Sequence, residues 1–272
     1  MFETFTPSRE ACLEYLGKEG ILDIFDIGEA YETGVFDNVT PSEVSFPPDP
    51  VDLYRLHMLV RSRRVFNVLE FGLGYSTIVM ADALSKNKYD FLQNHDRPDV
   101  RIREPFRVYA VDASKFWVER FHNIYKHLPI YDLIKLSHSE CIVGEHNGQI
   151  CHFYVDIPNV VTDFIYLDGP GIGDVKGSIN GISFDSCIER TVMSGDLLKM
   201  ESTFLPGTFV LIDGRTNNAR FLQNNFKRNY QIQFDEVYDI TTFELLEPPL
   251  GKINRNQIDY QLGKRYYERL NS

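Results

Sequence analysis

Four short segments of the chain share one pattern, an apolar run of β-branched and aromatic residues that stops at an acid with a small residue nearby. They are VFNVLEFG (65–72), FRVYAVDAS (106–114), DFIYLDGP (163–170) and GTFVLIDGR (207–215). Continuous apolar runs of this length are typical of strands that are buried on both faces, as in a parallel sheet covered by helices. Each segment is therefore predicted to be a central strand.

Stretches with apolar positions at helical spacing separate these runs. Helices are predicted at 76–84, 115–128 and 218–228, and a further strand, YDLIKLS, is predicted at 131–137. Strands that alternate with helices in this way imply right-handed βαβ units and an open sheet with helices on both faces. The predicted fold class is α/β, with a doubly wound, Rossmann-like sheet.

The two ends of the chain depart from the alternation. Residues 230–247 contain two strand-like runs with no helix between them, which predicts an antiparallel hairpin at the edge of the sheet. A polar helix around 255–270 is expected to close the chain. At the front, one amphipathic helix is predicted near 8–17, and a second at 51–63 leads into the first strand.

These elements predict one catalytic domain over residues 51–250. Residues 1–50 are expected to form a helical cap on the substrate side, and 251–272 a helical tail. Two inserts stand out, a polar stretch at 85–105 and a glycine-rich stretch at 169–183. Five glycines in fifteen residues after a strand end predict a mobile loop over a binding site.

Composition and net charge indicate which kinds of molecule the protein is expected to bind. Hydrophobic residues make up 43% of the 272 residues, charged residues 25%, and the net charge is −11. An acidic balance disfavours non-specific binding to nucleic acid or to an anionic membrane. The start shows no signal peptide, no apolar run is long enough to span a membrane, and the four cysteines show no CxxC spacing. We expect a cytoplasmic protein, and a homodimer is left open.

Four acids end the predicted central strands: Glu70, Asp112, Asp168 and Asp213. In an open α/β sheet, ligands bind in the crevice beyond the carboxyl ends of the strands. One acid at a strand end would mean little, because solvated strand ends often carry Asp. Four acids along one edge predict a common site.

The turn after the first strand, VLEFGLGYST (68–77), indicates the class of cofactor. Gly72 and Gly74 begin a dinucleotide-like frame that has Thr77 where a third glycine would stand. Glu70 would face a pyrophosphate with like charge, which costs about 4 kcal/mol at ~4 Å in an effective dielectric near 20. S-adenosylmethionine carries no phosphate, and its sulfonium and amino groups are positive. An acid in this turn therefore favours S-adenosylmethionine over a nicotinamide dinucleotide.

The four strand ends together, VLEFGLGYST, YAVDAS, FIYLDG and FVLIDGR, resemble the class I S-adenosylmethionine-dependent methyltransferases over roughly residues 50–247. Within that superfamily the chain is most similar to the small-molecule O-methyltransferase and glycan-modification branches. The resemblance implies a mostly parallel seven-stranded sheet with an antiparallel C-terminal hairpin strand. It departs from the family pattern at Tyr75, where many members have a small residue. By this resemblance the residues that bind the cofactor are Glu70, Gly72, Gly74, Ser76, Asp112 (the ribose), Ser139 and Glu140 (the adenine).

Asp168, Asp213 and Arg215 are predicted catalytic residues on the acceptor side. Methyl transfer needs an aligned acceptor oxygen and a group that removes its proton. A carboxylate does this alone or with a divalent cation such as Mg²⁺, for which Asp168 and Asp213 are the candidate ligands. Metal-dependent O-methyltransferases carry Asp-Asn at the second position, where this chain has Asp213 followed by glycine, so Asn217 or Asn218 would have to compensate.

Alternatives remain open for several of these residues. Asp213 could cap the following helix. Arg215 could be a surface residue, or its guanidinium could hold a phosphate, a carboxylate or sugar hydroxyls. His138 and His152 are alternative general bases, although a lone histidine is more often structural.

The predicted function is transfer of a methyl group from S-adenosylmethionine to an oxygen of a small molecule or sugar. Three rivals stand beside it. They are an NAD-dependent oxidoreductase on the same type of sheet, a non-catalytic partner-binding domain that kept the cofactor pocket, and a hydroxylase-associated relative with the same fold.

Overall fold

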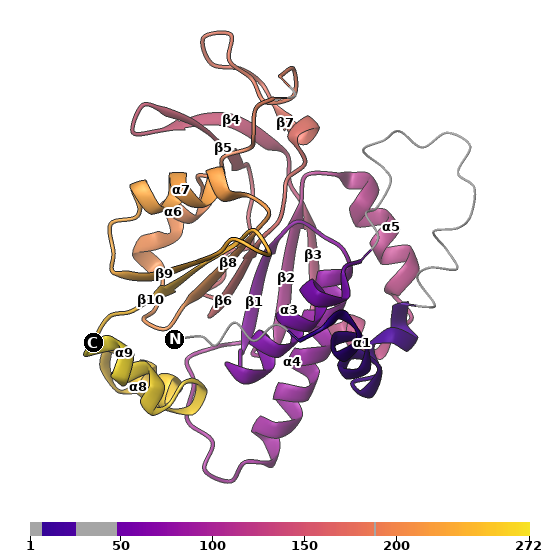
Figure 1. The fold of residues 1–272 in the computed structure, drawn as a ribbon, viewed down its shortest axis with the longest axis vertical. Helices are drawn as coiled ribbons and strands as arrows, with labels where there is room; N and C mark the ends of the chain where they lie inside the picture. The colour runs from indigo at the N-terminus through magenta and orange to yellow at the C-terminus, as the bar shows by residue number, and fades with distance from the viewer. Residues whose placement is uncertain (1–6, 26–47, 188) are drawn as a thin grey trace.

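The structure, a computed structural model, describes residues 7–25, 48–187 and 189–272. Its centre is a seven-stranded sheet of order β3-β2-β1-β6-β8-β10-β9 (Figure 1). Only β10 runs antiparallel to the other strands of this sheet. The strands are β1 (Asn67–Phe71), β2 (Arg107–Asp112), β3 (Ile134–His138), β6 (Phe164–Leu167), β8 (Phe209–Asp213), β9 (Tyr230–Asp235) and β10 (Ile240–Leu245). The Rossmann-like fold and the antiparallel C-terminal hairpin are confirmed.

Helices cover both faces of this sheet, as the apolar runs predict. Val68 of β1 belongs to one buried cluster and its neighbour Leu69 to the other, because successive side chains of a strand point to opposite faces. All five residues of β1 are buried. The α-helices are α1 (Arg9–Lys18), α3 (Pro50–Ser62), α4 (Tyr75–Gln93), α5 (Lys115–Tyr125), α6 (Asp196–Met200), α7 (Thr216–Asn225), α8 (Gly251–Gln261) and α9 (Lys264–Leu270). Among the described residues, the 3₁₀ segments are η2 (Pro129–Leu133), η3 (Ile172–Asp174) and η4 (Glu201–Thr203).

Two helix predictions were wrong in extent. The helix predicted at 76–84 continues as α4 to Gln93, because Asn87 and Phe91 are buried on its inner face within the stretch that reads as a polar insert. The single helix predicted at 255–270 is two helices, α8 and α9. Gly263 separates them with φ +58°, a left-handed conformation that ends a helix.

A second, small sheet of order β5-β4-β7 follows β3. Its hairpin joins β4 (Cys141–His146) and β5 (Gln149–Tyr154) through Asn147 and Gly148, both with positive φ, which suits a tight two-residue turn. The glycine-rich stretch predicted as a loop contains β7 (Val175–Lys176), which pairs with β4. Figure 1 shows this hairpin at the opposite end of the molecule from α8 and α9.

A buried histidine links the N-terminal segment to α4. His57 of α3 bonds to Tyr15 of α1 at 2.7 Å and to Asp82 of α4 at 2.9 Å. Part of the predicted cap, residues 26–47, lies outside the described residues. No described helix combines the length and the apolar character that crossing a membrane requires.

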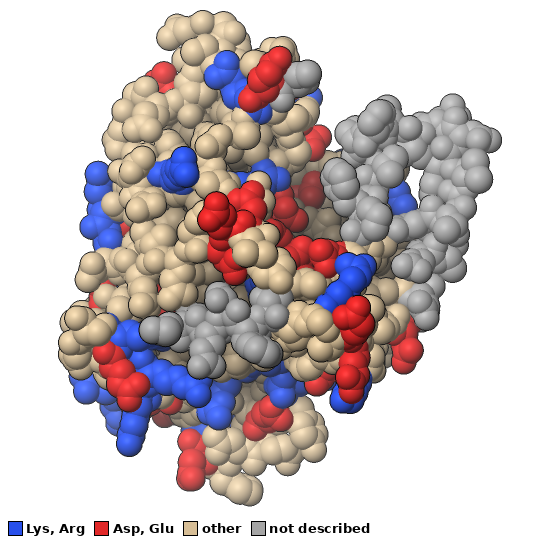
Figure 2. All heavy atoms as spheres, in the orientation of Figure 1, with Lys and Arg blue, Asp and Glu red and all other residues tan. Residues whose placement is uncertain are grey.

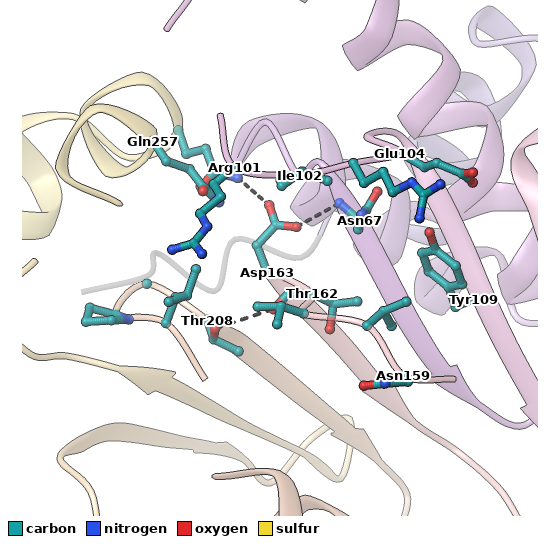
Figure 3. A pocket seen from close by; sticks show the side chains of 17 residues that line it. Asn67, Arg101, Ile102, Glu104, Tyr109, Asn159, Thr162, Asp163, Thr208 and Gln257 are labelled. Carbon is teal, nitrogen blue, oxygen red and sulfur yellow. Dashed lines mark hydrogen bonds between the residues drawn. The ribbon is translucent and has the colours of Figure 1, made fainter. Parts of the chain in front are cut away.

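Asp163, which directly precedes β6, holds together the amino ends of the strands. Its carboxylate accepts hydrogen bonds from the backbone N–H groups of Phe66 (2.8 Å) and Asn67 (2.7 Å), and from the side chain of Gln261 in α8. Figure 3 shows it among the residues that line a cavity of about 510 Å³ at this end of the sheet. The hydrogen bonds of this carboxylate therefore stabilise the fold.

Candidate active site

The four acids of the sequence prediction lie at the carboxyl ends of four adjacent strands, β2, β1, β6 and β8. Phe71 of β1 pairs with Val111 on one side and with Leu167 on the other, and Leu167 pairs with Ile212. The acids beside these residues are thus in register along one edge. In the view of Figure 2, other exposed acidic side chains also gather near the middle of the molecule, whereas Glu70 is buried.

Glu70 lies inside β1 and is completely buried. The Ser76 hydroxyl donates a hydrogen bond to its Oε1, whereas Oε2 has no partner among the described residues. Burial raises the pKa of Glu70 to about 8, although the hydroxyls of Ser76 and Thr77 oppose the shift. The carboxyl is therefore mostly protonated at pH 7 when nothing is bound. The argument from repulsion of a pyrophosphate assumed an ionised, exposed acid, and it does not apply to the free protein.

Gly72 and Gly74 of the turn differ in backbone conformation and in the space around them. Gly72 has φ +114°, and an added Cβ would lie 3.0 Å from the backbone nitrogen of Gly169, so the fold itself requires it. Gly74 has φ 177°, which any residue adopts, and no atom lies within 4 Å of where its Cβ would be. The space beside Gly74 is open at the N-terminus of α4. A ligand that approaches the backbone there would explain a glycine that the protein's own packing does not need.

Asp112 ends β2 and accepts a hydrogen bond from the backbone N–H of Ser114 at 2.7 Å. Burial, with Asp174 nearby, raises its pKa to about 6, so it is mostly ionised at pH 7. The predicted adenine contacts lie on the far side of β2. Ser139 is buried, and its hydroxyl accepts from the Asp156 N–H at 2.9 Å, whereas Glu140 is exposed.

The acceptor-side residues come from the ends of β6 and β8. Arg215 donates to the backbone carbonyls of Pro170 (3.1 Å) and Asp168, so part of its guanidinium holds the chain after β6 in place. The Tyr166 hydroxyl donates to Asp213 at 2.9 Å. Partial desolvation raises the pKa of Asp168, and Arg215 opposes this while Asp213 adds to it.

A cavity of about 610 Å³ opens beside these residues. Its lining carries both signs of charge and several neutral hydrogen-bonding groups. The lining residues with polar side chains are Asp168, Arg190, Thr191, Asp213, Arg215, Thr216, Asn217, Asn218 and Asp239. The predicted catalytic residues therefore share one cavity.

The candidate magnesium ligands differ in how their oxygens are used. The Oδ1 atom of Asn218 accepts from the Ser194 N–H at 3.1 Å, whereas Asn217 donates to Thr191 at 3.3 Å through its amide nitrogen. The oxygen of Asn218 is therefore already engaged, and that of Asn217 is not used by this bond. The metal remains a prediction.

Elsewhere in the described part of the chain, the side chains of Glu19, His57 and Asp82 lie close enough to share a cation. The ammonium group of Lys86 already lies 2.6 Å from both Glu19 and Asp82. This cluster is an internal ion-pair network that joins the N-terminal segment to α4.

The sequence analysis missed several polar residues around the site. Asp52 on α3 lies near enough to Asp213 to raise its pKa, after the larger effect of burial. Tyr154 on β5 and Arg190 have buried polar atoms without partners, and no local motif marks either residue. His152 was named as an alternative general base, and it is completely buried.

No protein-family model and no curated protein sequence matches the chain. Solved structures that it resembles include methyltransferases. The S-adenosylhomocysteine-bound methyltransferase PaMTH1 of Podospora anserina has 11% identity, with 82% of this chain and 88% of that chain covered and a TM-score of 0.48. The O-methyltransferase TomG of Streptomyces achromogenes, in complex with S-adenosylmethionine, has 13% identity, coverage of 88% and 98%, and a TM-score of 0.43. A methyltransferase of Geobacter sulfurreducens has 13% identity, coverage of 80% and 95%, and a TM-score of 0.45.

Proposed function

We propose that this protein is an S-adenosylmethionine-dependent methyltransferase that methylates a hydroxyl oxygen of a small molecule or sugar. The observation that carries the proposal is the carboxyl edge of the sheet. There an open space beside Gly74, a buried carboxyl with an unpartnered oxygen and an ionised Asp112 come together. These groups suit a ligand with a positive amino group and a ribose.

The order of the strands favours this function over the dinucleotide alternative. The fold that binds nicotinamide dinucleotides typically has six parallel strands in the order 3-2-1-4-5-6. Here an antiparallel strand, β10, stands between β8 and β9. The seven-stranded order with this hairpin is the one that the methyltransferase resemblance implies.

The cofactor would lie across the ends of β1 and β2. Its methionine part would approach the backbone at Gly74, and its amino group would bind Glu70, whose free Oε2 is positioned to accept. Asp112 would accept from the ribose hydroxyls. Ser76 keeps Glu70 oriented by its hydrogen bond.

Asp168 would accept the proton of the acceptor hydroxyl. A general base works best when its pKa lies near the working pH, and the surroundings of Asp168 raise its pKa from the ordinary value of an aspartate. Arg215 donates to the backbone carbonyls of Asp168 and Pro170, so it acts as a positioning residue. The bond that forms joins the acceptor oxygen to the methyl carbon, and the bond that breaks joins that carbon to sulfur. The products are the methyl ether and S-adenosylhomocysteine.

Calorimetric titration tests the proposal. We expect the protein to bind S-adenosylhomocysteine and to show no binding of NAD. Binding of NAD in preference would support the oxidoreductase alternative. Binding of the cofactor without methyl transfer across a broad panel of hydroxyl acceptors, and with no effect of Asp168→Ala, would instead support a non-catalytic domain.

A further inference from the structure

The central sheet ends in two edge strands, β3 and β9, which differ in sequence (Figure 1). An edge strand presents unpaired backbone N–H and C=O groups, and proteins commonly shield such an edge with lysine or proline. β3 carries Lys135 at an exposed position. β9, with the sequence YQIQFD, has neither lysine nor proline, and its one charged residue, Asp235, is its last. β9 is therefore an edge strand without this protection.

The hydrogen bonds of β10 show which backbone groups of β9 face outward. Tyr230 at the start of β9 lies opposite Leu245 of β10. Leu245, however, bonds to the other side. Its N–H donates to the Thr208 carbonyl and its carbonyl accepts from the Gly207 N–H, both at 2.9 Å. The backbone N–H and carbonyl of Tyr230 therefore point away from β10.

Three residues of β9 share this outward orientation. Along an antiparallel strand, residues that bond to the neighbouring strand alternate with residues that bond away from it. Ile232 and Phe234 follow Tyr230 at alternate positions, so their N–H and carbonyl groups also face outward. In the described part of the chain, no backbone group outside the sheet bonds to these three residues. Their backbone groups are left for water or for another strand.

The outward residues are arranged symmetrically about Ile232. Consider a second copy of β9 that runs antiparallel to the first and is related to it by a two-fold axis beside Ile232. Ile232 then lies opposite itself, and Tyr230 lies opposite Phe234 of the second copy. Every outward N–H faces an outward carbonyl in this register. A register shifted by two residues would leave one outward residue of each copy without its partner.

The side chains of β9 suit the same register. The Phe234 side chain is 52% exposed, and the Tyr230 ring of the second copy would lie opposite it. On the other face of the strand, Gln231 would lie opposite Gln233 of the second copy. The Oε1 atom of Gln231 has no partner among the described residues, and a glutamine amide supplies N–H donors.

The two ends of β9 carry opposite charges. Lys227 precedes the strand, whereas Asp235 ends it and Glu236 follows it, and both Lys227 and Glu236 are exposed. An antiparallel second copy brings the basic end against the acidic end, whereas a parallel strand would align like charges. We propose that the protein forms a two-fold symmetric dimer in which β9 pairs antiparallel with β9 of a second copy, with Ile232 at the axis.

Sedimentation velocity over a range of protein concentrations tests the proposal. We expect a reversible equilibrium between monomer and dimer. Its dissociation constant should be micromolar, because one pair of strands buries less surface than a standard interface of about 1,600 Å². Lys135→Glu, an exposed change on the other edge strand, is the matched control and should leave association unchanged.

Substitutions at the axis test the register. Ile232→Lys and Ile232→Glu should each weaken association at least about tenfold, because each places two like charges opposite one another. An equimolar mixture of the two variants should associate again, because the charges at the axis are then opposite. An interface elsewhere on the molecule would not give this recovery.

Hydrogen exchange of the wild-type protein needs no substitution, so it is independent of whether the variants fold. The N–H groups of Tyr230, Ile232 and Phe234 should exchange more slowly as the protein concentration rises, because the dimer bonds them. The N–H groups of Gln231 and Gln233 face β10 and should exchange at a rate that does not depend on concentration. Thermal unfolding shows whether each variant is folded.

Four results would each overturn the proposal. They are a wild-type protein that stays monomeric at every concentration, folded Ile232 variants that associate like wild type, an equimolar mixture that does not associate, and exchange of the outward N–H groups that does not depend on concentration. The proposed methyl transfer is tested separately, because none of these measurements involves the cofactor.

Discussion

Each end of the central sheet has an enclosed carboxyl group and a cavity, and the two carboxyl groups differ in how many hydrogen bonds they accept. At the amino end, Asp163 accepts two backbone hydrogen bonds and one from Gln261. At the carboxyl end, Glu70 accepts one from Ser76 and keeps an oxygen without a partner. The cavities are of similar size, about 510 and 610 Å³.

Cavity size therefore does not distinguish a ligand site from a structural gap in this protein. Burial raises the pKa of both carboxyls, so the shift of a pKa does not distinguish them either. The difference lies in the carboxyl oxygens themselves, because both oxygens of Asp163 accept hydrogen bonds and Oε2 of Glu70 has no partner among the described residues. A group whose bonds are all internal holds the fold, and a group with bonds left over is available to a ligand.

Removal of the Asp163 carboxylate should have the largest effect of the changes considered, and only on stability. Asp163→Ala leaves the N–H groups of Phe66 and Asn67 without their acceptor, which should lower the free energy of unfolding by about 3 kcal/mol. Chemical denaturation measures this loss. The folded variant should bind S-adenosylhomocysteine within twofold of wild type. A stable variant with weakened binding would reverse the roles assigned to the two ends.

The two glycines of the first turn also differ in role, because Gly72 is needed by the fold and Gly74 is proposed to be needed by the cofactor. Gly72→Ala should lower the free energy of unfolding by about 2 kcal/mol, because it forces a side chain into a left-handed conformation and against Gly169. Gly74→Ala should leave stability nearly unchanged and weaken S-adenosylhomocysteine binding at least about tenfold, because its methyl group would occupy the open space. Thermal unfolding and calorimetry measure the pair. Normal cofactor binding by Gly74→Ala would show that the space beside Gly74 is not part of the cofactor site.

Much of this carboxyl end could be predicted from local sequence. Central strands buried on both faces read as apolar runs, and acids at their ends fall on one edge once the strands are parallel. Glu70 and Asp112 lie at the ends of adjacent strands for that reason, as expected, and their role in binding a cofactor stays a prediction. The protonation of Glu70 could not be predicted, because burial depends on what packs over the strand. His152 lies next to the distant segment at Met193 through a backbone hydrogen bond, a pairing that no local pattern indicates.

Replacement of the buried acid should remove a dependence of stability on pH. The wild-type Glu70 carboxyl has a pKa of about 8 against an ordinary 4.5, so at pH 7 it is mostly protonated in the folded protein and ionised in the unfolded chain. Glu70→Gln should therefore match wild-type stability below pH 4.5 and exceed it at pH 7. The raised pKa makes wild-type stability fall as pH rises from 4.5 through 8, and the variant should lack this fall because it cannot ionise. Denaturation at pH 6 and pH 9 measures the difference.

Cofactor binding gives the second measurement on the same variant. The positive amino group of S-adenosylhomocysteine favours the ionised carboxylate, so wild-type binding at pH 7 should release a proton from Glu70. Calorimetry in buffers with different ionisation enthalpies counts that proton. The variant should release none from this position and should bind about tenfold more weakly. Equal proton release by wild type and Glu70→Gln would show that the amino group of S-adenosylhomocysteine does not bind at Glu70.

Magnesium should have the smallest effect, because the carboxyl edge offers Asp168 and Asp213 without an amide oxygen from Asn218. A bound ion would stabilise the folded state in proportion to its affinity, so millimolar Mg²⁺ should shift the unfolding temperature by less than about 1 °C. Asp213→Asn is the matched variant, since it removes one charge and keeps an oxygen beside Tyr166. A larger shift in wild type that the variant abolishes would support a bound Mg²⁺ at Asp168 and Asp213. The carboxyl end would then differ from the amino end in binding a cation as well as in the unpartnered oxygen of Glu70.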